Sequence, residues 1–468
     1  MRWGLHCPPM SSLALILVAA YALALLALAR GRAPGGAADY LLAGRRLTLP
    51  AFVATLVTTW YGGILGIGEY AWRFGISTWV VFGLPYYLAA LLFAFWLAPR
   101  LRSTTAMSIP DLLLDAYGPR ARLTGAAAVY ALTLPVAYVL MLATLLSQLT
   151  GWPMPVTAAA GAAFSALYVG VSGLRSVVRT DLLQLVLMYL GFGVLLAAAL
   201  GHTGGLGGLW SSLPAEHRSW DGGRGWQAVL VWYLIALQTM VEPAFYQRVF
   251  AARSPAVART GVVLSVAMWA AFDFLSIGCG LAARSLLPGL DDPLAAYPAL
   301  AELVLSPWLA AFFTLALFAT IMSTLDSYLF LAAATVGHDL ARDAAGEGAE
   351  RRRTRWGLAL SAALAAAGAL LFDSVVTVWH HVGSVVTSAL LLPVVAVHLP
   401  PRWRFTGGAA TAAMVLAAAV ALAWIVAGGE AGYPLGVEPM FPALAASVLV
   451  WGADRVVAGA ARRPATKR

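Results

Sequence analysis

The stretch "FATIMSTLDSYLFLAAAT", residues 318–335, determines how the rest of the chain is interpreted. Both of its flanks are apolar, while its centre carries Ser323, Thr324, Asp326 and Ser327. A carboxylate at membrane depth costs at least ~2.5 kcal/mol, so such residues usually face the interior of a helix bundle and mark a path for ions or protons. The stretch therefore predicts a functional helix at the centre of a larger bundle.

The hydroxyl groups of this stretch share one side of the predicted helix. Thr320, Ser323, Thr324 and Ser327 follow the spacing i, i+3, i+4 and i+7, which defines a single helical face. Such a face offers neutral oxygen ligands to a hard cation such as sodium. Serine and threonine in membrane helices also bond their own i−4 carbonyl or hold helices together, which is the alternative for the hydroxyls alone. Asp326 favours a cation or proton site.

The composition of the whole chain predicts an all-α polytopic membrane protein. Of its 468 residues, 61% are hydrophobic and 11% are charged, whereas soluble domains have about 25% charged residues. The mean hydropathy is +0.80. About thirteen apolar segments reach the ~20 residues that a transmembrane helix needs. They are residues 11–29, 48–68, 78–98, 123–149, 154–171, 181–200, 226–246, 260–283, 307–336, 357–372, 375–398, 407–427 and 438–457.

The basic residues predict the orientation of these segments in the membrane. When the thirteen segments alternate in direction, 25 of the 30 Lys and Arg residues fall in connections on one side. Because the arginine-rich side of a membrane protein is cytoplasmic, we expect the N-terminus outside and the C-terminus in the cytoplasm. This placement predicts a multi-pass protein of the cell's inner (plasma) membrane. It also accounts for the net charge of +9 without a nucleic-acid partner.

The second apolar segment has a glycine cluster that predicts an interrupted helix. The sequence "AFVATLVTTWYGGILGIGEYAWRFG", residues 51–75, contains Gly62, Gly63, Gly66 and Gly68. Each glycine costs a helix interior about 1 kcal/mol relative to alanine. Unwound backbone within a membrane requires burial or a watery cavity, and its free carbonyls can bind a cation. The alternative is close helix packing, because Gly62 and Gly66 have small-xxx-small spacing.

Three further sites in the sequence predict helix boundaries or polar positions. In "SIPDLLLDAYGPRAR", Ser108 is expected to cap, and Pro110 to start, a short interfacial helix. Glu242 directly precedes Pro243, which predicts a bend in the helix that contains them. Asp181 lies at the start of an apolar segment, and contact with water at a helix end is the alternative to a buried functional role.

Three motifs together resemble the sodium:solute symporters, a family of sodium-coupled carriers for sugars, proline, pantothenate and sialic acid. They are "GLRSVVRTDLLQ" (173–184), "QRVFAARSPAVARTG" (247–261) and "MSTLDSYL" (322–329), and the similarity extends in order and spacing from about residue 35 to 400. The resemblance implies a LeuT-like fold with two inverted five-helix repeats. The implied units are residues 1–47 with an extra helix and a cytoplasmic loop, 48–200 with the first repeat, 226–398 with the second repeat, and 399–468 with two C-terminal helices and a short cytoplasmic tail.

The resemblance also implies a sodium site between the interrupted helix and the hydroxyl-bearing helix. Its ligands would be the hydroxyls of Ser323 and Thr324, the carbonyl of Thr320, and the carbonyls of Leu56 and Thr59. Some members of the family have a further sodium site. The matching positions are Asp181, Asp326 and Ser327, where the aspartate at 326 departs from hydroxyl-rich relatives and could serve a cation or a proton. A solute site beside the interruption would involve Trp60, Tyr61, Gly62, Gln238, Glu242 and Ser384.

The function that this resemblance implies is sodium-coupled symport of a small organic solute by alternating access. The expected partners are the solute and the lipid bilayer, with sodium as the coupling ion, no other cofactor, no nucleic acid and no obligatory protein partner. Two alternatives stay open: a proton-coupled symporter that uses Asp181 or Asp326, and a transporter-like solute sensor. An enzyme is not expected, because the adjacent His380 and His381 would point to different faces of a helix.

Overall fold

The computed structural model describes residues 12–30, 35–341, 347–372, 375–429 and 432–461. The predicted C-terminal tail from residue 462 onward lies outside these residues. The first eleven helices are α1 Ser12–Ala29, α2 Ala37–Leu42, α3 Leu49–Trp60, α4 Ile64–Phe74, α5 Leu84–Leu92, α6 Ala98–Arg102, α7 Ile109–Tyr117, α8 Pro119–Thr133, α9 Val136–Thr150, α10 Met154–Ser172 and α11 Leu174–Thr203. The remaining ones are α12 Gly205–Ser212, α13 Trp226–Ile235, α14 Pro243–Ala251, α15 Pro255–Leu286, α16 Ala296–Val304, α17 Pro307–Ala334, α18 Glu347–Ala369, α19 Val375–Val397, α20 Gly407–Gly428 and α21 Met440–Ala461.

The all-helical membrane fold predicted from composition is confirmed. Within the described residues, twelve helical segments are long and apolar enough to cross a membrane, against about thirteen predicted. The difference is α18, whose second half covers residues 357–369 of the predicted segment 357–372. Its first turns carry Arg351, Arg352, Arg353 and Arg355, so too little of the helix is purely apolar. The count of thirteen is therefore approximate.

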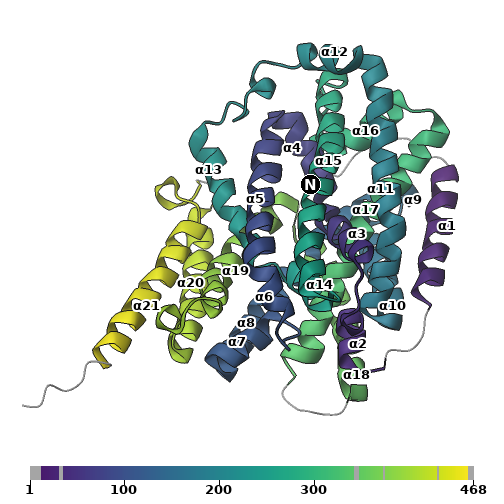
Figure 1. The fold of residues 1–468 in the computed structure, drawn as a ribbon. Helices are drawn as coiled ribbons and strands as arrows, with labels where there is room; N and C mark the ends of the chain where they lie inside the picture. The colour runs from purple at the N-terminus through teal and green to yellow at the C-terminus, as the bar shows by residue number, and fades with distance from the viewer. Residues whose placement is uncertain (1–11, 31–34, 342–346, 373–374, 430–431, 462–468) are drawn as a thin grey trace, which may run out of the picture.

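The hydroxyl-bearing helix α17 lies inside the bundle. It packs against α11, α3, α10, α9 and α18, and its residues from Phe313 to Ala333 are buried almost without interruption. Helix α1 lies at one edge of the bundle and α20 and α21 lie at the opposite edge (Figure 1). A polar face on α17 is therefore enclosed by protein, as the cost of a carboxylate in lipid requires.

Two spanning segments are interrupted where the sequence predicted a break and a bend. A single 3₁₀ turn, η2 at Tyr61–Gly63, separates α3 from α4. Glu242 has an extended backbone between the 3₁₀ segment η6, Ala236–Val241, and α14. Pro243 follows as the first residue of α14, where its missing N–H needs no partner. Both predictions are confirmed.

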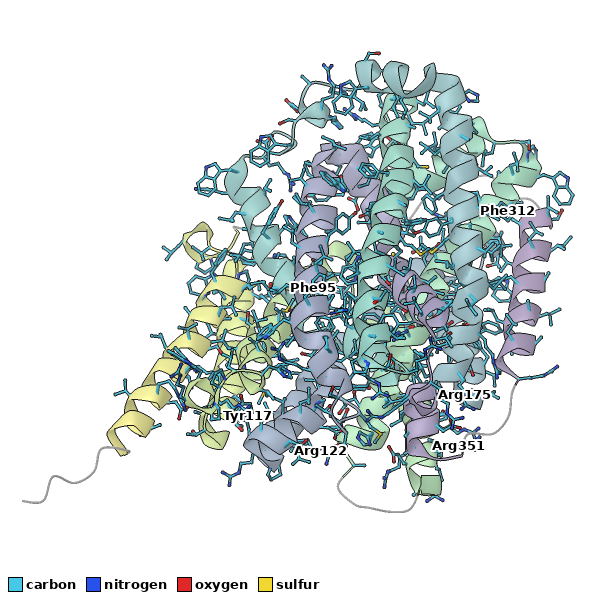
Figure 2. All side chains as sticks on the ribbon, viewed as in Figure 1. Phe95, Tyr117, Arg122, Arg175, Phe312 and Arg351 are labelled. Atoms are coloured by element: carbon cyan, nitrogen blue, oxygen red, sulfur yellow. The ribbon has the colours of Figure 1, made fainter. Side chains whose placement is uncertain are left out.

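One end of the bundle gathers basic side chains and a short capped helix. Figure 2 shows Arg122, Arg175 and Arg351 at the lower end of the view. The predicted interfacial helix is α7, and Ser108 caps it by accepting a hydrogen bond from the backbone N–H of Asp111 at 3.1 Å. This prediction is also confirmed.

At the same end, α7 is joined to the end of α17 and the start of α18. The ring nitrogens of His338 lie 3.1 Å from Asp111 Oδ2 and 2.8 Å from Glu350 Oε1. The Ser108 hydroxyl also donates to Asp339 at 2.5 Å. These polar contacts hold three elements together beneath the central cavity described below.

Candidate functional site

The 3₁₀ turn η2 allows α3 and α17 to approach closely. A Cβ atom built on Gly62 would lie 2.4 Å from the Cβ of Thr324, so only glycine fits this contact. The Thr324 hydroxyl donates to the carbonyl of Thr59 at 3.0 Å and lies 3.3 Å from the carbonyl of Thr58. The polar face of α17 therefore meets main-chain oxygens at the end of α3, beside the interruption.

The second hydroxyl of the α17 face contacts a buried carboxylate. Ser323 donates to Asp181 Oδ1 at 2.6 Å, and the hydroxyl of Thr55 donates to the other carboxylate oxygen. All three side chains are fully buried. Asp181 lies within α11 rather than at its end, so the alternative of contact with water is wrong. The predicted segment began at residue 181, which would have placed the aspartate at the helix end. Helix α11 instead begins seven residues earlier, at Leu174.

A buried arginine lies beside this carboxylate. Arg248, on α14, has no exposed surface. Its Nη2 lies 2.6 Å from the Ser327 hydroxyl, 2.9 Å from the Thr59 hydroxyl and 3.2 Å from that of Thr55. Its Nη1 donates to Gln247 at 2.9 Å. Hydropathy counting missed this role because a charged residue close to a helix end looks interfacial.

Asp326 faces α10, whereas Asp181 faces α3 and α17. The carboxylate of Asp326 accepts hydrogen bonds from Ser165, at 2.5 Å, and from Tyr168, both on α10. Ser327, by contrast, pairs with Thr59 at 2.9 Å and with Arg248. The three residues predicted for a further cation or proton site therefore belong to two separate hydrogen-bonded groups.

The backbone positions predicted as sodium ligands lie on the same two helices as the hydroxyls. Leu56 is buried on α3, one turn before the interruption, and Thr320 is buried on α17, one turn before Thr324. The Thr320 hydroxyl donates to the carbonyl of Ala316 at 2.8 Å, so its side chain is occupied within its own helix. The sequence analysis specified the main-chain oxygen of Thr320 as the candidate ligand, and that residue stays a prediction.

A cavity of about 180 Å³ lies directly beside the interruption. Five of the six residues predicted for a solute site line it: Trp60, Tyr61, Gln238, Glu242 and Ser384. Gly62 is not among the lining residues because it faces Thr324. The neighbouring glycine does face the cavity wall, since a Cβ on Gly63 would lie 1.6 Å from the indole of Trp379.

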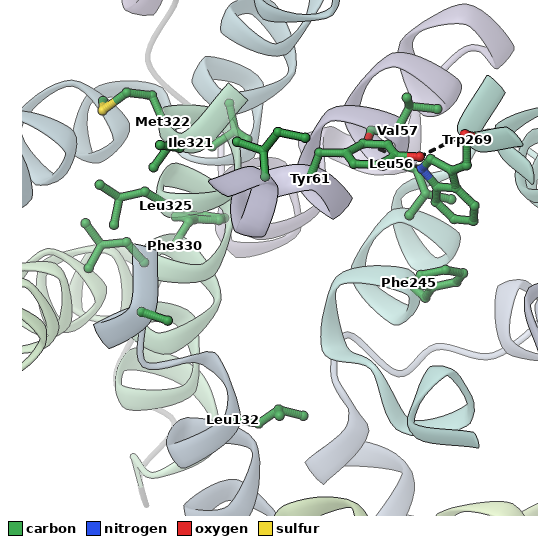
Figure 3. Packing of buried hydrophobic residues seen from close by; sticks show 14 of the residues in the cluster. Leu56, Val57, Tyr61, Leu132, Phe245, Trp269, Ile321, Met322, Leu325 and Phe330 are labelled. Carbon is green, nitrogen blue, oxygen red and sulfur yellow. Dashed lines mark hydrogen bonds between the residues drawn. The ribbon is translucent and has the colours of Figure 1, made fainter. Parts of the chain in front are cut away.

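The cavity has a second carboxylate that the sequence analysis left without a role. Asp273, on α15, accepts hydrogen bonds from the hydroxyl of Tyr61 at 2.8 Å and from that of Tyr87. The Tyr61 hydroxyl also lies 2.9 Å from the carbonyl of Trp269, a bond drawn in Figure 3 among the packed apolar side chains of α3 and α15. A charged residue inside the long apolar segment that became α15 was the available signal.

An interrupted helix, a buried polar face and a cavity beside the interruption, within a membrane-spanning bundle, define the architecture of a secondary transporter. The family model of the sodium:solute symporter family matches residues 40–399. The chain belongs to the sodium:solute symporter family. Its members are transporters, which agrees with the expectation that the chain is not an enzyme.

Two proteins to which the chain is similar are also transporters. The chain is 27% identical over 210 residues to a sodium-dependent multivitamin transporter of Oryctolagus cuniculus, covering 43% of this chain and 32% of that protein. It is 24% identical over 333 residues to sodium-coupled monocarboxylate transporter 1 of Homo sapiens, covering 64% of this chain and 53% of that protein. The matches thus span about a third and about half of the length of these relatives.

Solved structures place the chain in the LeuT-like fold. A Na⁺-coupled sialic acid symporter in a substrate-bound outward-open state matches with a TM-score of 0.78 and 15% identity, over 95% of this chain and 98% of that one. MHP1, a nucleobase-cation-symport-1 family transporter in a closed conformation, matches with a TM-score of 0.59 and 15% identity, over 92% of this chain and 95% of that one. At these identities the likeness establishes the fold.

Proposed function

We propose that the protein is a sodium-coupled symporter that moves a small organic solute across the membrane by alternating access. The observation that carries this proposal is the meeting of α17 with the end of α3. There the hydroxyls of Ser323 and Thr324 lie against the carboxylate of Asp181 and the carbonyls of Thr58 and Thr59. Clustered neutral oxygens beside the carboxylate of Asp181 suit a monovalent cation, and the guanidinium of Arg248, linked to that carboxylate through the Thr55 hydroxyl, offsets part of its negative charge.

The proposed sodium ligands are the hydroxyls of Ser323 and Thr324 and the main-chain carbonyls of Thr320, Leu56 and Thr59. They come from two helices that face each other across the glycine contact. A sodium ion bound between them would hold α3 and α17 together. Separation of these helices in the inward-opening step would remove ligands from the ion and release it.

The proposal assigns the predicted second cation or proton site chiefly to Asp181. A cation at Ser327 would lie against the guanidinium of Arg248, which disfavours it by like-charge repulsion. Asp326 is held by two hydroxyls of α10 and, in this proposal, anchors α17 to that helix. The coupled charge would therefore be bound by the group that contains Ser323 and Asp181.

The proposed arrangement in the membrane follows the distribution of arginine and the two helix interruptions. The N-terminus would lie outside the cell's plasma membrane and the C-terminus in the cytoplasm, with the arginine-rich end of Figure 2 inside. The interruptions occur in the first helix of residues 48–200 and in the first helix of residues 226–398. Paired interruptions at corresponding places support two inverted repeats around a central binding site.

A sodium gradient would drive uptake through this site. Each positive charge that crosses the full field contributes ~2.3 kcal/mol per 100 mV of membrane potential. The solute would bind in the cavity lined by Trp60, Gln238 and Glu242, next to the ion. Because Trp60 directly follows the proposed ligand Thr59, ion and solute would stabilise the same conformation of η2.

The proposal can be tested before the solute is known. The thermal stability of the purified protein is measured in sodium and in equal potassium, for the wild type and for the double variant Ser323→Ala/Thr324→Ala. A site saturated at 100 times its Kd stabilises the native state by about 2.7 kcal/mol. We expect a sodium-specific increase in the wild type that the double variant lacks.

Thr314→Ala is the matched control for this experiment. Thr314 is also buried on α17, but its hydroxyl donates only to the carbonyl of Ala310 at 3.0 Å. The control should keep the full sodium effect. Sodium-dependent stabilisation that persists in the double variant would refute the ligand assignment. Stabilisation that follows pH and ignores sodium would favour proton coupling instead.

A further inference from the structure

The charges around the central cavity are predominantly negative. Glu242 and Asp273 both line it, and they are 2% and 7% exposed. None of the described residues that line the cavity is a lysine or an arginine. A solute that carries a carboxylate would therefore meet two acidic groups and no basic side chain on the cavity wall.

Glu242 presents both carboxylate oxygens to hydrogen-bond donors at the start of α14. It lies at the N-cap of α14, where the helix dipole favours negative charge, and its Oε1 lies 3.4 Å from the N–H of Ala244. The hydroxyl of Tyr328 donates to the same oxygen at 3.0 Å, and the amide of Gln238 lies 3.4 Å from Oε2. All three neighbours are donors, which suits a carboxylate that can only accept.

Histidine does not offset this negative charge. His380 lines the cavity, but its Nε2 lies 2.8 Å from the carboxylate of Glu438. Its ring also stacks on Tyr433, whose hydroxyl lies 3.2 Å from His380 Nδ1. The carboxylate of Glu438 thus lies directly against His380 and faces any positive charge on its ring. The described cavity wall therefore holds no lysine or arginine beside the two carboxylates, and Arg248, buried further along α14, is not among the lining residues.

Aromatic rings form much of the cavity wall, together with aliphatic side chains. The ring of Trp60 lies edge-to-face with Tyr86 at 5.2 Å, and Tyr138 lies between Tyr328 at 5.1 Å and Trp379 at 6.2 Å. All five residues line the cavity. Faces of tryptophan and tyrosine attract cations, and quaternary ammonium groups are held by such rings in many proteins.

We infer that the solute is an organic cation, an amine or alkylated ammonium compound whose positive charge is bound between the cavity carboxylates and the aromatic rings. This inference rests on the proposed function and specifies its substrate class. It separates this chain from the relatives named for monocarboxylates and sialic acid, whose solutes are anions. Glu242 is the residue that we expect to select for charge, because it faces the cavity from the bend before α14.

The test compares a charged compound with an uncharged compound of the same shape. Choline is titrated into the purified protein in saturating sodium, alongside dimethylbutanol, in which a tert-butyl group replaces the trimethylammonium group. Thermal stability reports binding, and tetramethylammonium, an alkylamine, acetate and glucose complete the set. We expect saturable stabilisation by at least one ammonium compound, with the uncharged isostere weaker by about tenfold or more.

Two variants connect this selectivity to the cavity. Glu242→Gln keeps the size of the side chain and should weaken binding of the ammonium compound by about tenfold, while leaving the isostere unchanged. Glu302→Gln makes the same change on the exposed face of α16, outside the cavity, and should change nothing. Sodium stabilisation measured without any organic solute tests the proposed function separately and should survive in Glu242→Gln.

Three outcomes would overturn the inference. The first is equal binding of choline and its isostere, which would show that charge is not recognised. The second is stabilisation by acetate or glucose with none by the ammonium compounds. The third is a normal sodium effect with no response to any compound of the ammonium set, because the ion site would then be intact while the predicted class fails.

Discussion

Replacement of Arg248 by methionine should destabilise the protein strongly. Its two terminal nitrogens contact four side-chain oxygens, and the nearest lie 2.6 Å and 2.9 Å away. Charge-assisted hydrogen bonds contribute about 1.5–3 kcal/mol each, so the loss of four has an upper limit of about 12 kcal/mol. Ser327 and Thr59 already lie 2.9 Å apart and can pair with each other. We therefore expect a loss of about 3–5 kcal/mol, the range for breaking a buried charge pair.

The reason for this loss is tested by a double-mutant cycle with Asp181. The Thr55 hydroxyl links the two charges, because it donates to Asp181 and accepts from Arg248. If the guanidinium compensates the carboxylate, Arg248→Met combined with Asp181→Asn should cost clearly less than the sum of the single changes. The free energy of unfolding in detergent micelles, obtained from denaturant titrations, measures all four proteins.

A surface arginine provides the control for this cycle. Arg175 forms an ion pair with Asp39, and their side chains are 28% and 22% exposed. Because exposed pairs contribute about 0–1 kcal/mol, Arg175→Met should have a small effect. A loss below about 1 kcal/mol for Arg248→Met, or strict additivity with Asp181→Asn, would refute the compensation argument.

Two other predictions concern the helix interruption and the arginine-rich end. Gly62→Ala places a methyl group 2.4 Å from Thr324, so it should lower the free energy of unfolding by about 1–3 kcal/mol and abolish sodium-dependent stabilisation. Gly193→Ala, where the added methyl group meets open space, should have neither effect. An unchanged sodium response in Gly62→Ala would contradict the packing argument. Burial raises the pKa of Asp111, but the hydrogen bond and charge of His338, the backbone N–H of Met107 and the charge of Arg122 together outweigh burial and hold the pKa below its usual value. Asp111 therefore stabilises the fold above about pH 4 and loses this effect as the pH falls through its lowered pKa, so melting temperatures across this range should be less pH-dependent in Asp111→Asn.

Local sequence signals predicted the fold because they depend on short-range chemistry. Ser108 caps α7 and Pro243 starts α14, since capping and proline geometry involve only neighbouring residues. The glycines at 62 and 63 also marked the interruption, because glycine lowers helix stability wherever it occurs. Such signals locate elements without any knowledge of their partners.

The partners of the buried charges could not be predicted in the same way. The oxygens around Arg248 belong to residues 79 to 193 positions away in the chain, apart from that of Gln247. Asp326 and Ser327 are adjacent in sequence, yet their side chains face different helices. Successive side chains on a helix point about 100° apart, so only tertiary packing decides which of them reaches a site.

The direct succession of Thr59 and Trp60 gives the proposed mechanism a thermodynamic consequence. The carbonyl of Thr59 accepts a hydrogen bond from Thr324, and the ring of Trp60 lines the cavity. Two ligands that order the same peptide unit are linked by one coupling free energy, so each changes the affinity for the other by the same factor. A substitution at Trp60 should thus alter the affinity for sodium as well as for the solute, and the product of the two linked equilibria is independent of which ligand binds first.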